Sequence, residues 1–183
     1  MKPIVTAAIV MLLLSGCGLT PERQSSADQS TPSPTTRDVD GCPLTLPPRP
    51  GFVPPQPYPP EPGFEQVWYG TPALWTILKP QGEVWRNLPV GKDGSVGNKA
   101  LWFSESFSTS QGEDFSGDAD VTVTAVRLDG SAPKVVEEGG VPSFNRDIKN
   151  FMLVGLILPE SGCWEVTASY QGTELSYVLL VEH

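Results

Sequence analysis

Beyond residue 65 the chain alternates apolar and polar positions in short runs, and this pattern predicts an all-β domain. Nine runs are rich in the β-branched and aromatic residues that favour strands: 66–69, 73–78, 83–88, 99–104, 120–128, 134–137, 151–158, 163–170 and 174–182. Turn-forming residues such as Pro80-Gln81-Gly82 and Glu138-Gly139-Gly140 separate them. Because no apolar period of about 3.6 residues persists, we expect few and short helices. About seven to nine strands in this length predict an antiparallel β-sandwich.

Residues 163–182 show the clearest alternation. Apolar side chains occupy every second position on both sides of a Gln171-Gly172 turn: Trp164, Val166, Ala168, Tyr170, Leu175, Tyr177, Leu179 and Val181. This period of two predicts a hairpin with one buried face. The string PESGCWEV at 159–166 resembles the closing hairpin of bacterial immunoglobulin-like domains. The resemblance implies an immunoglobulin-like sandwich in which Trp164 takes the place of the corner tyrosine.

The N-terminal residues have the pattern of an export signal. After Met1-Lys2, an apolar run at 4–14 would span about 16 Å as a helix, which is too short for a bilayer core of about 30 Å. Leu14-Ser15-Gly16-Cys17 follows and resembles the end of the signal in bacterial lipoprotein precursors. The resemblance implies cleavage after Gly16 and attachment of diacylglycerol to the Cys17 sulfur. A plain secretory signal with an incidental cysteine is the alternative.

These patterns divide the chain into four parts. They are a signal peptide (1–16), a lipidated cysteine with a flexible tether (17–41), a proline-rich strap (42–65) and the β-sandwich (66–183). The tether has only Leu19 and Val39 as sizeable apolar residues, too few to offset the entropy of ordering it. In the strap, nine of the sixteen residues from 47 to 62 are proline, which favours polyproline II. Four side chains among these prolines are expected to pack against the sandwich: Phe52, Val53, Tyr58 and Phe64.

The net charge of the chain limits the classes of partner that it can bind. There are 12 Lys and Arg residues against 21 Asp and Glu, a net charge of −9. Phosphate recognition needs clustered cations, so we expect no nucleic-acid partner. Anionic lipid head groups would repel so acidic a chain, and the lipid on Cys17 is therefore expected to make the membrane contact. The predicted location is the extracytoplasmic face of the cell membrane or the outer membrane.

The sequence offers little for catalysis. The single histidine is the last residue, His183, and no G-x-S-x-G motif is present. Without a nucleophile and a base in reach, we expect no catalytic residues and no enzyme activity. An acidic loop, with Glu113, Asp114, Asp118 and Asp120, has oxygen ligands of the kind calcium takes, but its spacing matches no calcium loop. We therefore expect no metal and no cofactor.

The cysteines indicate a disulfide bond that joins the strap to the sandwich. With Cys17 lipidated, Cys42 and Cys163 are the remaining thiols, and an exported protein meets oxidising conditions. Alternation places Cys163 on the face opposite Trp164, where it could reach the strap that begins at Cys42. This predicts a Cys42–Cys163 disulfide. Two buried free thiols are the alternative.

The tryptophans give ligand binding its only support in the sequence. Trp68, Trp75, Trp85 and Trp102 fall in the N-terminal half of the domain. A buried set would simply be core, the favoured interpretation, whereas exposed indoles can stack on sugars. Trp75 and Trp102 are the candidate platforms.

A wider resemblance covers most of residues 42–183. Four segments are similar to those of a group of uncharacterised exported bacterial proteins: CPLTLP at 42–47, WYG at 68–70 with LW at 74–75, VRLD at 126–129, and residues 155–166. No activity follows from that group. The sequence therefore predicts a membrane-anchored, non-enzymatic envelope module that contacts another protein or a wall polymer. A carbohydrate-binding or sugar-active cell-wall protein is the alternative.

Overall fold

The structure is a computed structural model that describes residues 35–109 and 119–182. This part of the chain contains eleven strands and no helix: β1 (Thr35–Val39), β2 (Cys42–Leu46), β3 (Val67–Thr71), β4 (Leu74–Leu78), β5 (Glu83–Trp85), β6 (Val96–Phe103), β7 (Ala119–Arg127), β8 (Val135–Asn145), β9 (Lys149–Leu158), β10 (Gly162–Tyr170) and β11 (Thr173–Val181). The nine predicted runs correspond in order to β3–β11, so the all-β prediction is confirmed. Within these residues, no helix has the length and apolar character needed to cross a membrane.

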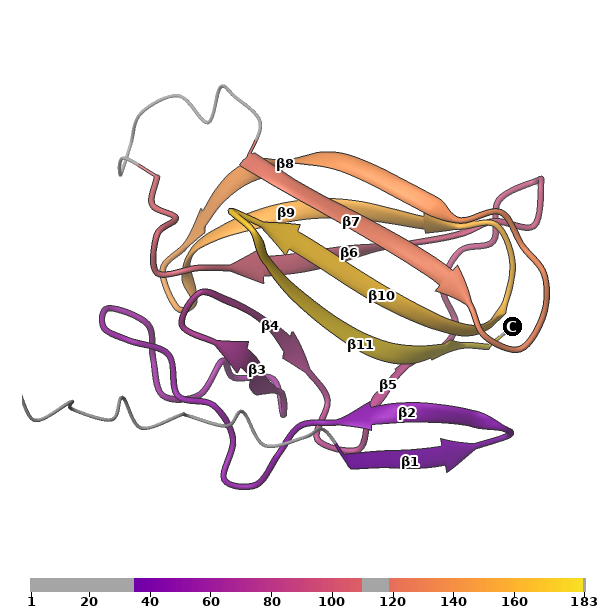
Figure 1. The fold of residues 1–183 in the computed structure, drawn as a ribbon, viewed down its shortest axis with the longest axis horizontal. Coiled ribbons are helices and arrows are strands. Elements are labelled where there is room, and N and C mark those ends of the chain that lie inside the picture. Colours follow the sequence, from indigo (N-terminus) through magenta and orange to yellow (C-terminus); the bar gives the residue numbers. More distant parts are fainter. Residues whose placement is uncertain (1–34, 110–118, 183) are drawn as a thin grey trace, which may run out of the picture. The chain divides into compact units, whose positions relative to one another are not determined.

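Strands β3–β11 form one sheet that curls into two facing layers (Figure 1). Their order is β3-β4-β6-β9-β8-β7-β10-β11-β5. Residues 135–140 of β8 pair with β7, whereas residues 141–145 pair with β9, so this strand passes from one layer to the other. Every pairing in the sheet is antiparallel except that of β5 with β11. The antiparallel prediction therefore holds for all but this one short edge strand.

The topology is that of an immunoglobulin-like sandwich. One layer contains β4, β6, β9 and the second half of β8, which correspond to strands A, B, E and D of that fold. The other layer contains β7, β10 and β11, which correspond to C, F and G. At the start of β10 the indole Nε1–H of Trp164 donates to the carbonyl oxygen of Glu160 at 3.3 Å. A corner tyrosine makes a comparable bond, from its hydroxyl to the backbone a few residues upstream, so this contact agrees with the role that the resemblance implies for Trp164.

Two glycines mark where β8 changes layer. The sequence pattern placed a turn at Glu138-Gly139-Gly140, but these residues continue the strand. Gly139 has a φ of 78°, which lets the backbone bend there. A Cβ on Gly140 would lie 3.0 Å from Cγ1 of Val121 and 3.2 Å from Cγ2 of Val154. The two glycines predicted a break in the strand by their composition. In the structure they instead allow β8 to bend as it passes between two packed layers.

The core between the layers consists mainly of apolar side chains. Its fully buried larger side chains are Leu74, Leu78, Trp102, Met152, Leu156, Leu158, Trp164 and Leu179. They come from the inward-facing positions of strands in both layers, as the period of two predicts. The closing hairpin of β10 and β11 forms as expected, with Gln171 and Gly172 in left-handed conformations at its turn.

The proline-rich strap covers a second apolar cluster on the outside of the β3-β4-β6 layer. Phe52 and Tyr58 pack on Trp75, with ring centroids 5.6 and 5.0 Å apart, as predicted. Val53 and Phe64 do not pack there, and are 63% and 89% exposed. Val53 follows Phe52 in an extended chain and so points away from the cluster. Phe64 lies near the C-terminal end of the strap, in a turn described below.

The chain that leads into the strap forms a hairpin, which the sequence pattern did not predict. Residues 35–39, assigned to the tether, make up β1 and pair with β2, which was assigned to the strap. Asp40 and Gly41 are both left-handed, with φ of 52° and 82°. Asp-Gly is the typical two-residue turn of a β-hairpin, and this signal was outweighed by the polar composition around it.

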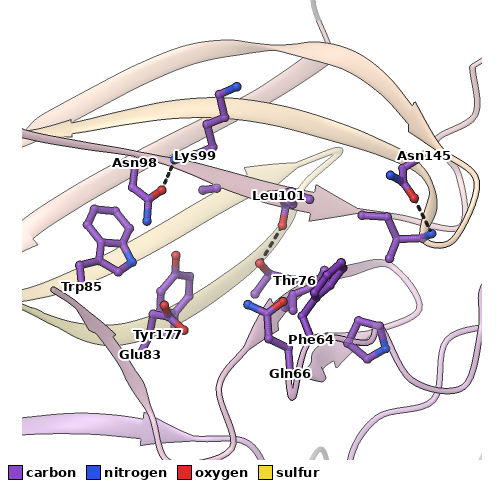
Figure 2. Close-up of a pocket in the computed structure, with 14 residues that line it drawn as sticks. Phe64, Gln66, Thr76, Glu83, Trp85, Asn98, Lys99, Leu101, Asn145 and Tyr177 are labelled. Atoms are coloured by element: carbon purple, nitrogen blue, oxygen red, sulfur yellow. Dashed lines mark hydrogen bonds between the residues drawn. The ribbon is translucent and has the colours of Figure 1, made fainter. Parts of the chain in front are cut away.

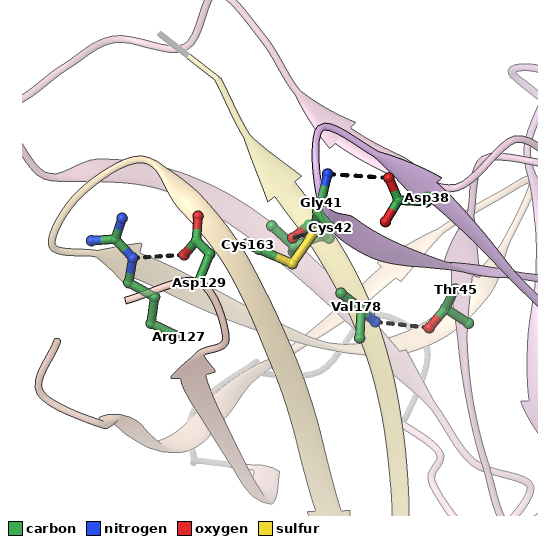
Figure 3. The surroundings of a disulfide bond; sticks show 9 residues. Asp38, Gly41, Cys42, Thr45, Arg127, Asp129, Cys163 and Val178 are labelled. Carbon is green, nitrogen blue, oxygen red and sulfur yellow. Dashed lines mark hydrogen bonds and ion pairs between the residues drawn. A yellow bond between two sulfur atoms is a disulfide. The ribbon is translucent and has the colours of Figure 1, made fainter. Parts of the chain in front are cut away.

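The predicted disulfide fastens this hairpin to the sandwich (Figure 3). Cys42 is bonded to Cys163 of β10, with Cα atoms 5.4 Å apart and a sequence separation of 121. Both cysteines are buried, together with Leu44 and Leu180. Thr45 adds a polar contact, because its Oγ1 accepts a hydrogen bond of 2.8 Å from the backbone N–H of Val178. The two cysteines are therefore paired rather than free.

Candidate functional site

The tryptophans chosen as sugar platforms lie inside the protein. Trp75 and Trp102 are both 0% exposed, so the prediction that they stack on a ligand is wrong. Trp102 points between the two layers, 5.9 Å from the ring of Tyr177, and Trp75 is covered by Phe52 and Tyr58 of the strap. All five tryptophans of the chain are buried in this way. Core packing, the favoured interpretation, is the role that the structure gives them.

A cleft of about 300 Å³ opens where β4 and β6 separate (Figure 2). The two strands pair only at Trp75–Phe103 and Thr76–Trp102, and then diverge. Residues 98–101 of β6 form one wall, and β5 and β11 contribute Glu83, Trp85 and Tyr177. The cleft is therefore a consequence of the topology, since β4 follows one layer while the next strand, β5, joins the other.

Two backbone groups on the open edge of β6 are bonded by side chains (Figure 2). The hydroxyl of Thr76 donates to the carbonyl oxygen of Leu101 at 2.7 Å. The side-chain oxygen of Asn98 accepts a 2.8 Å hydrogen bond from the backbone N–H of Lys99. This second bond leaves the amide NH₂ of Asn98 as a donor without a partner among the described residues.

Phe64 stands at the rim of the cleft. Gly63, Phe64 and Glu65 have φ of 83°, 54° and 56°, three left-handed residues in succession. A bulky residue rarely adopts this conformation, and such strain is concentrated at functional sites. The turn is held by a hydrogen bond of 3.1 Å from the N–H of Gln66 to the carbonyl oxygen of Gly63. The turn presents the ring of Phe64, which is 89% exposed. Gln66, the first residue after the turn, lines the cleft.

A second hollow, of about 660 Å³, continues from the first. It lies between the strap and the turn that joins β8 to β9, and the two hollows share Pro62 and Phe64 in their walls. Together they form a groove, which we call the Phe64 groove. Its charged side chains balance: Glu83 with Lys99 in the first hollow, and Glu61 and Asp147 with Arg146 and Lys149 in the second. The groove therefore attracts neither anions nor cations strongly.

Two titratable side chains lie on the floor of the first hollow. The Glu83 carboxylate accepts the N–H of Lys79 at 3.2 Å and pairs with its ammonium at 3.6 Å. Burial nevertheless raises the pKa of Glu83 above its usual value, and Lys79 offsets only part of that rise. Burial also raises the pKa of the Tyr177 hydroxyl, with a smaller contribution from Glu83. The phenol is therefore a neutral donor at pH 7, and it has no hydrogen-bond partner in the described part of the chain.

This set of groups is suited to binding. The lining of the first hollow includes one carboxylate, Glu83, and no serine, cysteine or histidine from the residues that the structure covers. Nucleophilic catalysis needs an activated nucleophile, and glycoside hydrolysis needs two carboxylates across the bond that breaks. What the groove does contain is unbonded polar donors beside an exposed aromatic ring, which can hold a ligand without reacting with it.

A third cavity, of about 320 Å³, lies between the β1–β2 hairpin and β5, and Arg37, Lys79 and Arg86 line it. Two of these cations are already paired. Both Nε and Nη2 of Arg86 bond to the carboxylate of Glu182, at 2.5 and 2.9 Å, and Lys79 pairs with Glu83. The apparent excess of positive charge is therefore largely compensated inside the protein.

Some predicted site residues lie outside the described residues. The lipidation site Cys17 does, and so do residues 113, 114 and 118 of the acidic loop, in which no calcium site is expected. Asp120, the fourth acidic residue, is exposed on β7. Across residues 35–109 and 119–182, no three potential metal ligands come together.

Comparison with protein-family models, with curated proteins and with solved structures found no match for this chain.

The groove residues carry almost no signal in the amino-acid sequence. The sequence pattern predicts packing for Phe64 and indicates no ligand-binding role for Gln66, Asn98 or Tyr177. One local signal was present: Gly63-Phe64-Glu65-Gln66 places an aromatic residue between polar neighbours at the end of a proline run, where a turn is favoured. The rest depends on the divergence of β4 from β6, which has no signature in the sequence.

Proposed function

We propose that the protein is a membrane-anchored bacterial surface lipoprotein whose immunoglobulin-like domain is a non-enzymatic binding module of the cell envelope. The observation that carries the anchor is the fate of the three cysteines. Two of them, Cys42 and Cys163, form a disulfide, a bond that persists in exported proteins. The third, Cys17, stands at the end of the apolar signal, in the Leu-Ser-Gly-Cys motif. Disulfide and signal thus support the same destination independently.

The Phe64 groove supports the binding role. It combines an exposed ring with the free donors of Asn98 and Tyr177, and its first hollow has only one carboxylate, where glycoside hydrolysis needs two. Small-molecule sites in proteins have this character, apolar walls with a few placed polar groups, and volumes from about 300 Å³ upward. The partner is an envelope component, because a lipid anchor confines the module to the membrane surface.

The anchor is tested by Cys17→Ala in the full chain, with Ser25→Ala as the matched control. We expect metabolic labelling with palmitate and retention on membranes to be lost in Cys17→Ala and unchanged in Ser25→Ala. A Cys17→Ala protein that is still cleaved after Gly16 and still retained on washed membranes would refute the anchor.

The binding role is tested by immobilising the full-length protein and capturing components from a detergent extract of the envelope. We expect a component that wild-type protein retains and Phe64→Ala releases. Phe144→Ala is the control, because Phe144 is 37% exposed on β8 and alternation points it away from the groove-lining Asn145. Identical capture by all three proteins would contradict a binding role for the groove.

A further inference from the structure

The Phe64 groove presents polar donors beside an apolar ring, and this combination restricts the ligand. Asn98 offers an amide NH₂, and Tyr177 offers a phenol hydroxyl, which is protonated at neutral pH. Gln66 adds a second amide on the wall beneath Phe64. A purely apolar ligand would leave these donors without partners, at a cost in free energy. The ligand must therefore carry acceptors, and hydroxyl or acetamido groups supply them.

The charge balance of the groove excludes strongly charged ligands. Each hollow contains as many carboxylates as cations, and the chain as a whole carries a net charge of −9. A phosphate-rich polymer or an anionic head group needs clustered Lys or Arg side chains, and such a ligand would also be repelled at longer range. An uncharged ligand meets neither penalty.

The edge of β6 argues against a peptide ligand that adds a strand. An added strand must bond to free backbone groups along an open edge. Here the N–H of Lys99 is bonded by Asn98, and the carbonyl oxygen of Leu101 is bonded by Thr76. These two bonds interrupt the ladder that a peptide would need, although β4 has moved away and left the edge open.

We propose that the Phe64 groove binds an uncharged glycan chain, with one sugar ring stacked on Phe64 and the hydroxyl or acetamido groups of the next ring bonded by Gln66, Asn98 and Tyr177. This assignment rests on the proposed binding role of the groove. The left-handed turn at residues 63–65 fixes the Phe64 ring at the junction of the two hollows. Each hollow has the volume for at least one ring, so the ligand is a chain that crosses Phe64 rather than a single sugar.

The test is calorimetric titration of the full-length protein, in mild detergent, with two uncharged tetrasaccharides, one of N-acetylglucosamine and one of glucose. We expect saturable binding of at least one. Phe64→Ala should weaken it about tenfold, the size of effect that an aromatic stacking contact has. Phe64→Tyr should bind nearly as well as wild-type protein, and Phe144→Ala should bind equally well.

Because Phe64 is so exposed, its variants are expected to fold, and circular dichroism and thermal unfolding provide the check. Gln66→Ala is the second groove variant and should also weaken binding. The proposal is overturned if neither tetrasaccharide binds at millimolar concentration, or if Phe64→Ala and Gln66→Ala bind as well as Phe144→Ala. A palmitate-labelled protein that captures an envelope component through Phe64, yet binds neither glycan, would retain the proposed function and refute only the ligand class.

Discussion

The indole Nε1–H of Trp164 bonds to the carbonyl oxygen of Glu160, and the carboxylate of Glu160 pairs with Arg127. Arg127 also bonds to Asp129 at 2.8 Å, and the backbone N–H of Leu128 donates to the carbonyl oxygen of Cys163, again at 2.8 Å. One buried tryptophan therefore connects the β9–β10 turn to the end of β7. The ion pairs around it are partly exposed, and such pairs contribute little to stability.

Two substitutions of Trp164 separate the contribution of its hydrogen bond to stability from the contribution of its packing. Trp164→Phe keeps most of the apolar contact but leaves the carbonyl group of Glu160 without its donor, so we expect a loss of about 1–2 kcal/mol in the free energy of unfolding. Trp164→Ala should lose about 3–5 kcal/mol. Urea denaturation with the disulfide intact provides the measurement. Equal losses in the two variants would show that the hydrogen bond is the larger contribution.

Replacing Gly70 tests whether the close approach of the β3 and β4 backbones requires glycine at this position. Its φ is 137°, and a Cβ there would lie 2.6 Å from the Cα of Trp75 and closer still to the carbonyl oxygen of Leu74. We expect Gly70→Ala to lose about 3 kcal/mol or more, since both strain and overlap oppose it. Gly155→Ala is the control, because no atom lies within 4 Å of its added Cβ. Similar unfolding curves for the two variants would contradict this account of β3 and β4.

The disulfide can be tested by removing both sulfurs. The bond closes a loop with a sequence separation of 121, and the chain-entropy treatment gives an upper figure of about 5 kcal/mol for such a loop. The double variant Cys42→Ser, Cys163→Ser should lose a few kcal/mol and should expose the β1–β2 hairpin to proteolysis near Asp40. Thiol labelling of denatured, unreduced wild-type protein is the complementary measurement. Two reactive thiols in freshly exported protein would refute the bond.

Glu83 provides a test by pH. Burial raises the pKa of this carboxyl in the folded state, so ionisation costs the folded protein more than the unfolded chain. That cost is absent below the pKa that Glu83 has in the unfolded chain. It develops as the pH rises through the pKa of Glu83 in the folded state, and it is complete above that second pKa. Glu83→Gln avoids the cost while keeping an acceptor for the N–H of Lys79. We expect the variant to gain in melting temperature over wild-type protein between pH 4 and pH 7. A difference that is independent of pH would contradict the assignment.

The sandwich could be predicted from the sequence because apolar and polar positions alternate along its strands. Alternation in β7, β10 and β11 is regular, and inward positions such as Val123, Val166 and Leu179 are buried as expected. The disulfide was also predictable, since the predicted export signal and the face of Cys163 together left few options. The prediction failed where one residue type serves two structural purposes. Gly139 and Gly140 indicate a turn by composition, but they form the bend inside β8.

The groove was not predictable for a different reason. Its wall residues come from segments as far apart as Gln66, Asn98 and Tyr177, and only the divergence of β4 from β6 brings them together. Composition also misdirected the choice of aromatic residue. Trp75 has the larger aromatic surface and is buried, whereas Phe64 is exposed and adopts a left-handed backbone conformation that no composition rule anticipates.

The position of the disulfide also determines how the domain would respond to mechanical load. A pull on the chain upstream of Thr35 passes through the β1–β2 hairpin and reaches Cys42. From there the covalent bond transfers the load to Cys163 at the start of β10, which lies inside its sheet between β7 and β11. To extend further, the chain would have to shear β10 along two neighbouring strands at once instead of peeling off an edge strand. The segment 43–162, which includes the strap and most of the groove, is enclosed in the covalent loop and cannot be drawn out while the bond is intact.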